Sequence, residues 1–247
     1  MAEKLDKLRK IMWKYVPGNS LFTRHKNIPK KLQIQLIGFI GHGKSSLINS
    51  CLCAWKNEEF RDRAGASSGL QTVTTRRDVY TMTGSISMVD SAGAPLMDRK
   101  AVSEIKLQTG GYRKPGEEVI WDKGFWSFVK DCFVWSDADV LLVPVIVFKA
   151  SCGLAPAVMT DLITELDNAS GIAPLVVITF ADEYKGDIQQ LKEDFATLHC
   201  PHVFIVTCYN KENKEDRDDA LDKILLDFLV ACTDVAEKTL RFKCSIK

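Results

Sequence analysis

Apolar runs along the chain predict strands of two kinds. Nearly continuous runs are typical of strands buried on both faces of a parallel sheet, and they occur at 138–148 and 173–180. A short apolar run of strand type, with Leu32, Ile34, Leu36 and Ile37, predicts the first strand. Two shorter runs flank Thr83-Gly84 and predict a β-hairpin over 79–89, and residues 203–207 predict a last strand.

Apolar residues at helical spacing separate these strands. They predict helices at 2–16, 44–56, 154–168, 187–197 and 219–232. Because strands and helices alternate, we expect an α/β fold in three layers, with a six-stranded, mostly parallel sheet and a helical N-terminal extension. Ligands of such sheets bind beyond the carboxyl ends of the strands, so polar residues at those ends are candidates for function.

The first strand leads into a glycine-rich segment, and residues 32–47 read LQIQLIGFIGHGKSSL. The phosphate-loop (P-loop) pattern of Gly, four residues and Gly-Lys-Ser is met by Gly38, Gly43, Lys44 and Ser45. Glycines let backbone N–H groups wrap a triphosphate, while Lys44 would reach the β- and γ-phosphates and Ser45 would bind Mg²⁺. The alternative is a glycine-rich turn without a ligand, which leaves the Lys-Ser pair unexplained.

A second motif lies at the end of the hairpin, which closes with Asp90-Ser91-Ala92-Gly93. An Asp at the end of an apolar strand can hold a water of Mg²⁺, and the following Gly can offer its N–H to a γ-phosphate. Asp-x-x-Gly is a weak signal alone, but its distance beyond the P-loop supports a nucleotide site.

Composition narrows the class of protein. The chain has 247 residues, of which 46% are hydrophobic, and this suits one large domain with appendages. A net charge of +1 gives no global field that would favour nucleic acid. The eight cysteines form no Cys-x-x-Cys pair, and no signal-peptide core or membrane-spanning apolar run occurs. We therefore expect a cytoplasmic protein with reduced thiols.

Three segments are expected along the chain: an N-terminal helix and linker at 1–31, a nucleotide-binding domain at 32–235, and a basic tail at 236–247. The N-terminal helix has an apolar stripe among many lysines, so it either docks on the parent domain or lies on an anionic membrane. The tail carries Cys244 four residues from its end, as in prenylation signals, but the terminal Lys247 departs from that pattern.

An aromatic-rich insertion is expected at about 94–136, within the nucleotide-binding domain. Its aromatic residues are Trp121, Phe125, Trp126, Phe128, Phe133 and Trp135. Two interpretations remain open: the insertion packs on its own domain, or it forms a surface for a partner or for self-association.

Together the motifs resemble those of P-loop GTPases of the translation-factor-related class, over about residues 32–233. The first switch loop would end in Thr74-Thr75-Arg76-Arg77, a run that looks like dynamin-type first switches. The base-reading motif would be Thr179-Phe180-Ala181-Asp182, and the last base loop Thr207-Cys208-Tyr209. The Thr-x-x-Asp motif and the long insertion are also similar to interferon-inducible 44-like proteins.

The resemblance implies a G domain that binds GTP or GDP with Mg²⁺ and self-associates. The metal would be held by Ser45, Thr75 and Asp90, with Thr74 as the second choice for Thr75. Gly93 would sense the γ-phosphate, and Asp182 would accept from guanine, with Phe180 and Cys208 lining the base. The other nucleotide contacts would come from Gly38, Gly41, His42, Gly43, Lys44, Ser46 and Thr179.

Departures from the family pattern bear on affinity and catalysis. Phe180 stands where the family has Lys, so we expect weaker nucleotide affinity. Ala94 stands where Ras-like enzymes place a water-orienting Gln, so we expect slow hydrolysis. Lys44 would still serve the phosphates, and help would come from a dimer partner, from His42 or from Thr75. The alternative for His42 is that of an exposed loop residue.

Two other functions remain open at this stage. The chain could be a non-catalytic nucleotide-binding scaffold, a pseudo-GTPase that works through its aromatic insertion, as Ala94 and Phe180 suggest. It could also be an ATP-using kinase or ATPase. Asp182 argues against ATP, because adenine does not offer the pair of donors that this carboxylate would accept from guanine.

Overall fold

The computed structural model describes residues 1–21, 28–65, 78–91, 93–94, 102, 104–105, 109, 139–210 and 217–245. The first switch loop with Thr74 and Thr75 lies outside the described residues, and so does nearly all of the insertion. The strands are β1 (Lys31–Ile37), β2 (Asp78–Thr81), β3 (Ile86–Asp90), β4 (Val140–Lys149), β5 (Leu175–Thr179) and β6 (Val203–Val206). The helices are α1 (Ala2–Lys14), α2 (Lys44–Lys56), α5 (Pro156–Ser170), α6 (Ile188–Thr197) and α7 (Asp219–Ser245).

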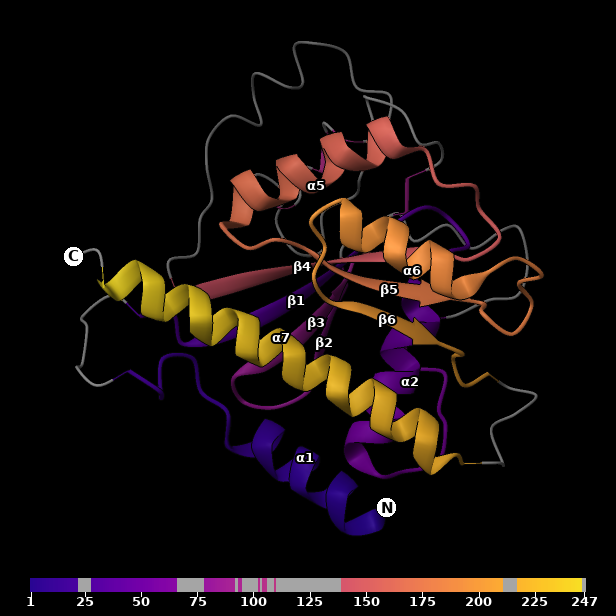
Figure 1. Cartoon of the computed structure of the whole chain (residues 1–247). Coiled ribbons are helices and arrows are strands. Elements are labelled where there is room, and N and C mark those ends of the chain that lie inside the picture. Colours follow the sequence, from indigo (N-terminus) through magenta and orange to yellow (C-terminus); the bar gives the residue numbers. More distant parts are fainter. Residues whose placement is uncertain are drawn as a thin grey trace.

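The strands form one six-stranded sheet in the order β2-β3-β1-β4-β5-β6, and Figure 1 shows it behind α7. All neighbouring pairs are parallel except β2 and β3, which pair antiparallel as the expected hairpin. The central strands read as apolar runs because both faces are covered, and β5 is buried along its whole length. The predicted α/β fold with a mostly parallel sheet is therefore confirmed.

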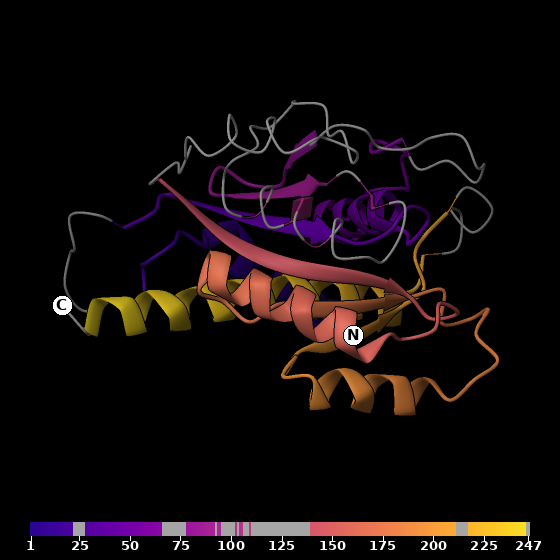
Figure 2. The ribbon, with the colours of Figure 1, turned by 90° about the horizontal axis from the view of Figure 1, so that it is seen from above.

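Helices cover both faces of the sheet and make the expected three layers. One core cluster joins the sheet to α1, α2 and α7, through residues such as Met12, Ile48 and Phe228. A second cluster on the opposite face joins the sheet to α5 and α6, through Leu162 and Phe195. Figure 2 shows α5 and α6 on the same side of the sheet.

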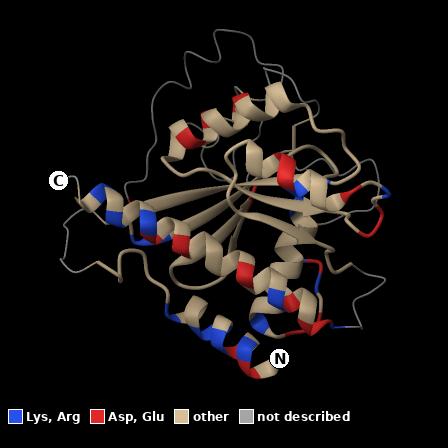
Figure 3. Ribbon diagram, viewed as in Figure 1, with Lys and Arg blue, Asp and Glu red and all other residues tan. Residues whose placement is uncertain are grey.

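The N-terminal helix docks on the domain, as one of its two interpretations predicted. Leu5 and Met12 are buried in the cluster that includes α2 and α7, and α1 packs mainly on α7. Its lysines stay exposed, and Figure 3 shows that basic residues recur along α1. None of the helices that the structure describes is long and apolar enough to span a bilayer.

The last helix is longer than predicted. α7 continues through Ser245 instead of ending near Cys232, so most of the expected tail is helical. The physical reason is that Ala236 and Leu240 continue the buried stripe of α7 at helical spacing. Tyr15, just beyond α1, also lies partly buried against the cluster to which this stripe belongs.

Removing the buried side chain that seats α1 should destabilise the protein. Met12 is fully buried, so we expect Met12→Ala to lower the free energy of unfolding by about 2–5 kcal/mol. The matched control is Ile11→Ala on the same helix, where the side chain is 41% exposed and the loss should stay below about 1 kcal/mol. Urea unfolding measures both, and equal losses would show that α1 does not dock as described.

Candidate functional site

The P-loop joins β1 to α2 and lies against the end of β4. Gly38 has no room for a side chain, since a Cβ there would lie 2.4 Å from the Val147 carbonyl oxygen. Gly43 caps α2 with φ of 82°, a left-handed conformation that glycine adopts without strain. The loop thus approaches the sheet closely and presents the N-terminus of α2, where backbone N–H groups favour anions.

Lys44 is folded back onto the loop. Its Nζ donates to the carbonyl oxygens of Gly38 at 3.1 Å and Phe39 at 3.0 Å, and only 6% of the residue is exposed. Burial lowers the pKa of Lys44 to about 8, an effect that the nearby Asp90 carboxylate opposes. An ammonium that is removed from water and hydrogen-bonded to these two carbonyls is suited to meet a phosphate group, whose negative charge would stabilise its charged form.

Ser45 and Asp90 meet at the next step of the site. The Ser45 hydroxyl donates to Asp90 Oδ2 at 2.6 Å, while Asp90 Oδ1 is buried and finds no hydrogen-bond partner among the described residues. Burial raises the pKa of Asp90, partly offset by the Ser45 hydrogen bond and by Lys44. A hydroxyl beside a buried, incompletely paired carboxylate is a donor set that fits Mg²⁺.

Gly93 and Ala94 bring the second motif against the P-loop. A Cβ on Gly93 would lie 2.9 Å from both the Ile40 nitrogen and Lys44 Nζ, so only glycine fits there. Ala94 exchanges backbone hydrogen bonds with the loop, from its N–H to Gly38 at 3.2 Å and from Ile40 to its carbonyl at 3.0 Å. Ala94, at the position of a water-orienting Gln in Ras-like enzymes, therefore presents only a methyl group, and this group is fully buried.

A pocket opens beside the P-loop, on the side of β5 and β6. Its lining comprises Gly43, Ser46, Thr179, Phe180, Asp182, Glu183, Thr207, Cys208, Tyr209 and Asn210. The structure thus brings the predicted base-reading motif and the last base loop to one cavity. Because Gly43 of the loop and Ser46 at the start of α2 also line the pocket, the two parts form one continuous site.

Thr179 and Phe180 fasten the pocket to the loop. The Thr179 hydroxyl lies within donating distance of the His42 carbonyl at 2.9 Å and of the Phe148 carbonyl at 3.3 Å. Phe180 has φ of 55°, rare for a side chain of this size, and its ring lies so near Gly43 that a Cβ there would be 3.3 Å from it. Lys149 Nζ lies 4.5 Å from the centroid of that ring, a cation–π contact.

Lys149 is a site residue that the sequence analysis missed. Its signal was available, because it is the first polar residue after the apolar run of β4 and so stands at the carboxyl end of a central strand. It supplies a positive charge beside Phe180 of the predicted base-reading motif.

The far wall of the pocket is fixed to α2. The Tyr209 N–H donates to Ser50 Oγ at 2.9 Å, and this hydroxyl donates to the Ser46 carbonyl at 2.8 Å. Burial raises the pKa of Cys208 to about 12, although a hydrogen bond with Ser50 opposes this, so the thiol lines the pocket in its neutral form. Cys208 and Asp182 both lie at the cavity, as predicted.

His42 is buried, so its interpretation as an exposed loop residue is wrong. Only 4% of it is exposed, and its ring packs edge-on against Phe39 and Phe148. Nδ1 lies 3.3 Å from the Lys149 N–H, and Nε2 lies 3.3 Å from Cys152 Sγ. Burial lowers its pKa to about 4. The ring is turned toward β4 because Phe39 and Phe148 form an apolar environment there, and its contacts help to hold the loop on the sheet.

Comparisons with known proteins give distant similarities. No protein-family model matches the chain, and no curated protein matches it significantly. The crystal structure of a dimerization-deficient mutant of Toc33 from Arabidopsis thaliana is similar over 96% of this chain and 91% of that one, with 16% identity and a TM-score of 0.49. The GDP-bound RocCORdC structure of Methanosarcina barkeri Roco2 has 15% identity and a TM-score of 0.44. It is matched over 88% of this chain and 53% of its own length, and similarities of this size carry no information on activity.

The buried imidazole should make stability depend on pH. The pKa of His42 is lower in the folded state than in the unfolded chain, so the unfolded chain binds the proton first as pH falls. Stability is therefore full above the unfolded value near 6.5 and is lost as pH falls toward 4, by about 2 kcal/mol between about pH 7 and pH 5. Urea unfolding of wild type and His42→Gln at both pH values measures this loss. An equal loss in the two proteins would assign the pH dependence to other groups.

Proposed function

We propose that this chain is a G domain that binds GTP and GDP with Mg²⁺ and hydrolyses GTP slowly. The observation that carries the proposal is the continuity of the P-loop with the pocket that holds Asp182, Phe180 and Cys208. One end of the site suits phosphates, and the other suits a flat base with hydrogen-bond donors. The Thr-Arg-Arg run and the Thr-x-x-Asp motif favour a place among dynamin-like or interferon-inducible 44-like G domains.

The residues at the phosphate end would act by exchanging internal contacts for ligand contacts. Lys44 would leave the two loop carbonyls for the β- and γ-phosphates, and the N–H groups at the start of α2 would hold the phosphate oxygens. Ser45 and Asp90 would hold Mg²⁺, which when bound neutralises charge on the phosphates. Thr75 is proposed as a further metal ligand and as a contributor to hydrolysis.

At the base end, charge and stacking would select the nucleotide. The Asp182 carboxylate would accept from the N1–H and 2-amino groups of guanine, and Phe180 would offer a stacking surface backed by the Lys149 cation. The Thr179 hydroxyl donates to the His42 carbonyl and so connects the motif to the P-loop. The Phe180 side chain has no polar group and could not make such a hydrogen bond. Base and phosphates would thus be read by parts of the same rigid frame.

Catalysis would be limited by the absence of a water-orienting group at Ala94. The buried position of Ala94 and the inward ring of His42 support slow turnover by the isolated chain, with self-association through the G domain as the source of help. The same two features favour a second candidate, a nucleotide-binding scaffold without catalysis. Contact with a membrane through the exposed lysines of α1 is compatible with either.

Base selectivity should depend on Asp182. With a fluorescent GDP analogue and Mg²⁺ bound, we expect GDP and GTP to compete and ATP to fail. Asp182→Asn should lower the affinity for guanine nucleotides by roughly 10–100-fold, because a hydrogen bond to a charged group contributes about 1.5–3 kcal/mol. Glu183→Gln, which alters the neighbouring carboxylate of the same pocket, is the matched control and should change little. Equal competition by ATP would instead indicate a kinase or ATPase.

Turnover should rise with protein concentration if self-association assists it. We expect phosphate release per chain to increase as the protein is concentrated and to vanish in Lys44→Ala, which removes the ammonium from the phosphates. Phosphate release at saturating GTP measures this. Rates per chain that do not change with concentration would refute assistance by a second copy. No turnover above the Lys44→Ala background, with binding intact, would select the scaffold.

A further inference from the structure

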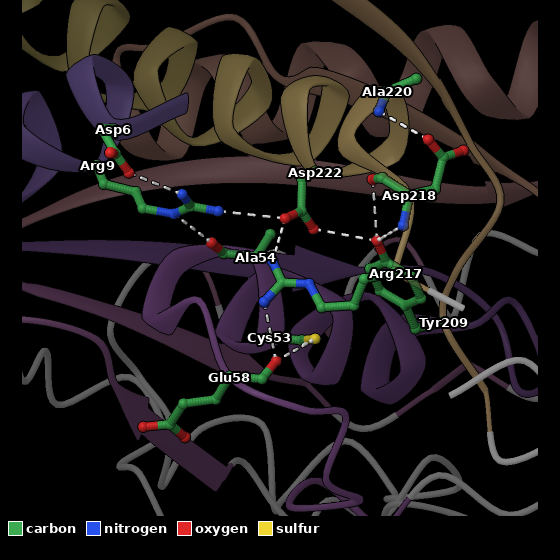
Figure 4. Close-up of polar contacts among 10 residues, drawn as sticks. All are labelled: Asp6, Arg9, Cys53, Ala54, Glu58, Tyr209, Arg217, Asp218, Ala220 and Asp222. Carbon is green, nitrogen blue, oxygen red and sulfur yellow. Dashed lines mark hydrogen bonds and ion pairs between the residues drawn. The ribbon is translucent and has the colours of Figure 1, made fainter. Parts of the chain in front are cut away.

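A buried carboxylate at the start of α7 gathers three donors, one of them from the distant N-terminal helix. Asp222 is 1% exposed, and its Oδ2 is paired with the guanidinium groups of Arg9, at 3.2 Å, and of Arg217. Its Oδ1 lies 3.1 Å from the Tyr209 hydroxyl. Figure 4 shows these groups converging between α1, α2 and the first turn of α7. A carboxylate with this set of partners is fixed in place, because each of its two oxygens faces a donor.

Tyr209 connects this cluster to the pocket, because it contacts Asp222 and also lines the cavity. Its hydroxyl accepts from the Asp218 N–H at 3.0 Å, and its own proton faces the Asp218 carbonyl and Asp222 Oδ1, both at 3.1 Å. At its other end the Tyr209 N–H is held by Ser50 of α2. Tyr209 also lines the pocket, so its position sets one side of the cavity.

Arg9 connects the cluster to two more helices. Its Nε donates to the Ala54 carbonyl at 2.9 Å, in the last turn of α2, where helix carbonyls lack intrahelical partners. Its guanidinium also reaches Asp6 in α1 at 3.1 Å. One side chain, 14% exposed, therefore ties α1 to the end of α2 and to the start of α7.

We propose that Arg9 is a positioning residue for the base pocket: α1, through Arg9, Asp222 and Tyr209, sets the wall of the cavity beside Asp182 and thereby the affinity for the nucleotide. The effect on nucleotide affinity rests on the proposed nucleotide site, whereas the linkage from Arg9 to Tyr209 rests on the described contacts. Displacement of α1 would loosen the Tyr209 wall while leaving the phosphate end of the site, at the other end of α2, in place. The N-terminal helix is thus a means by which anything that binds α1 would change nucleotide affinity.

The test compares Arg9→Met with wild type in the full chain. Methionine keeps an apolar stem and removes the donors, and Arg217 remains to pair with Asp222. We expect GDP affinity to fall by roughly fivefold or more, while the affinity for inorganic tripolyphosphate, which needs the P-loop alone, changes by less than about twofold. Arg9→Lys, with the charge but a single donor site, should fall between the two. Lys7→Ala, an exposed lysine of the same helix, is the matched control.

A second readout needs no nucleotide. The amide hydrogen of Tyr209 should exchange faster in Arg9→Met than in wild type or Lys7→Ala, because its partner Ser50 no longer faces a fixed wall. Combining Arg9→Met with Tyr209→Phe should weaken GDP binding no more than Tyr209→Phe does, since the hydroxyl that carries the effect is already gone.

The outcomes separate this inference from the proposed function. A wild-type chain that binds no guanine nucleotide would refute the proposed function, while the exchange of the Tyr209 amide would still decide the linkage. Unchanged Tyr209 exchange in Arg9→Met, or equal losses for GDP and tripolyphosphate, would overturn the inference and leave Arg9 as a residue of general stability.

Discussion

The parallel pairing of β1 with β3 on one side and β4 on the other is the interaction on which the candidate site depends. In this register Leu36 lies opposite Asp90, so β1 and β3 end within one residue of each other, while Ile37 lies opposite Ile146 and β4 continues beyond it to Lys149. The chain must leave β1 by a loop that crosses this edge, and the loop passes so close to β4 that only glycine fits at Gly38. The second motif, the Lys149 cation and the end of β5 are then neighbours by topology.

Burial gives this edge its chemistry. Lys44 and Asp90 are both removed from water, and desolvation disfavours the charged form of each. Their opposite charges, and the internal hydrogen bonds of each, offset only part of that cost, and among the described residues Asp90 Oδ1 has no hydrogen-bond partner. An anion at Lys44 together with a cation at Ser45 and Asp90 would complete both sets of contacts. His42 is also removed from water, but burial lowers its pKa, so it stays neutral between its aromatic neighbours.

The sequence predicted the parts of this structure that depend on local pattern. Apolar periods located the strands and helices, and the P-loop and Asp-x-x-Gly motifs located one end of the site because glycine, lysine and aspartate have few substitutes there. Contacts between residues far apart in the chain could not be predicted from local sequence patterns. Nothing local tells that His42 turns toward Cys152, or that Arg9 meets Asp222 across 213 positions. The end of α7 was set too early because a stripe that continues through Ala236 and Leu240 lies within a basic, polar segment.

The Asp222 cluster shows why such long-range contacts matter for function more than for stability. Removing a carboxylate and two guanidinium groups from water costs free energy, and their mutual attraction often repays only that cost. An apolar trio of similar volume could hold α1, α2 and α7 together as well. What apolar packing cannot do is fix a hydroxyl at a defined point, because dispersion contacts have little directionality. Tyr209 needs a defined point, since one side of it belongs to the cluster and the other to the pocket. The network is therefore best understood as a device that sets the geometry of the cavity wall from the position of the N-terminal helix.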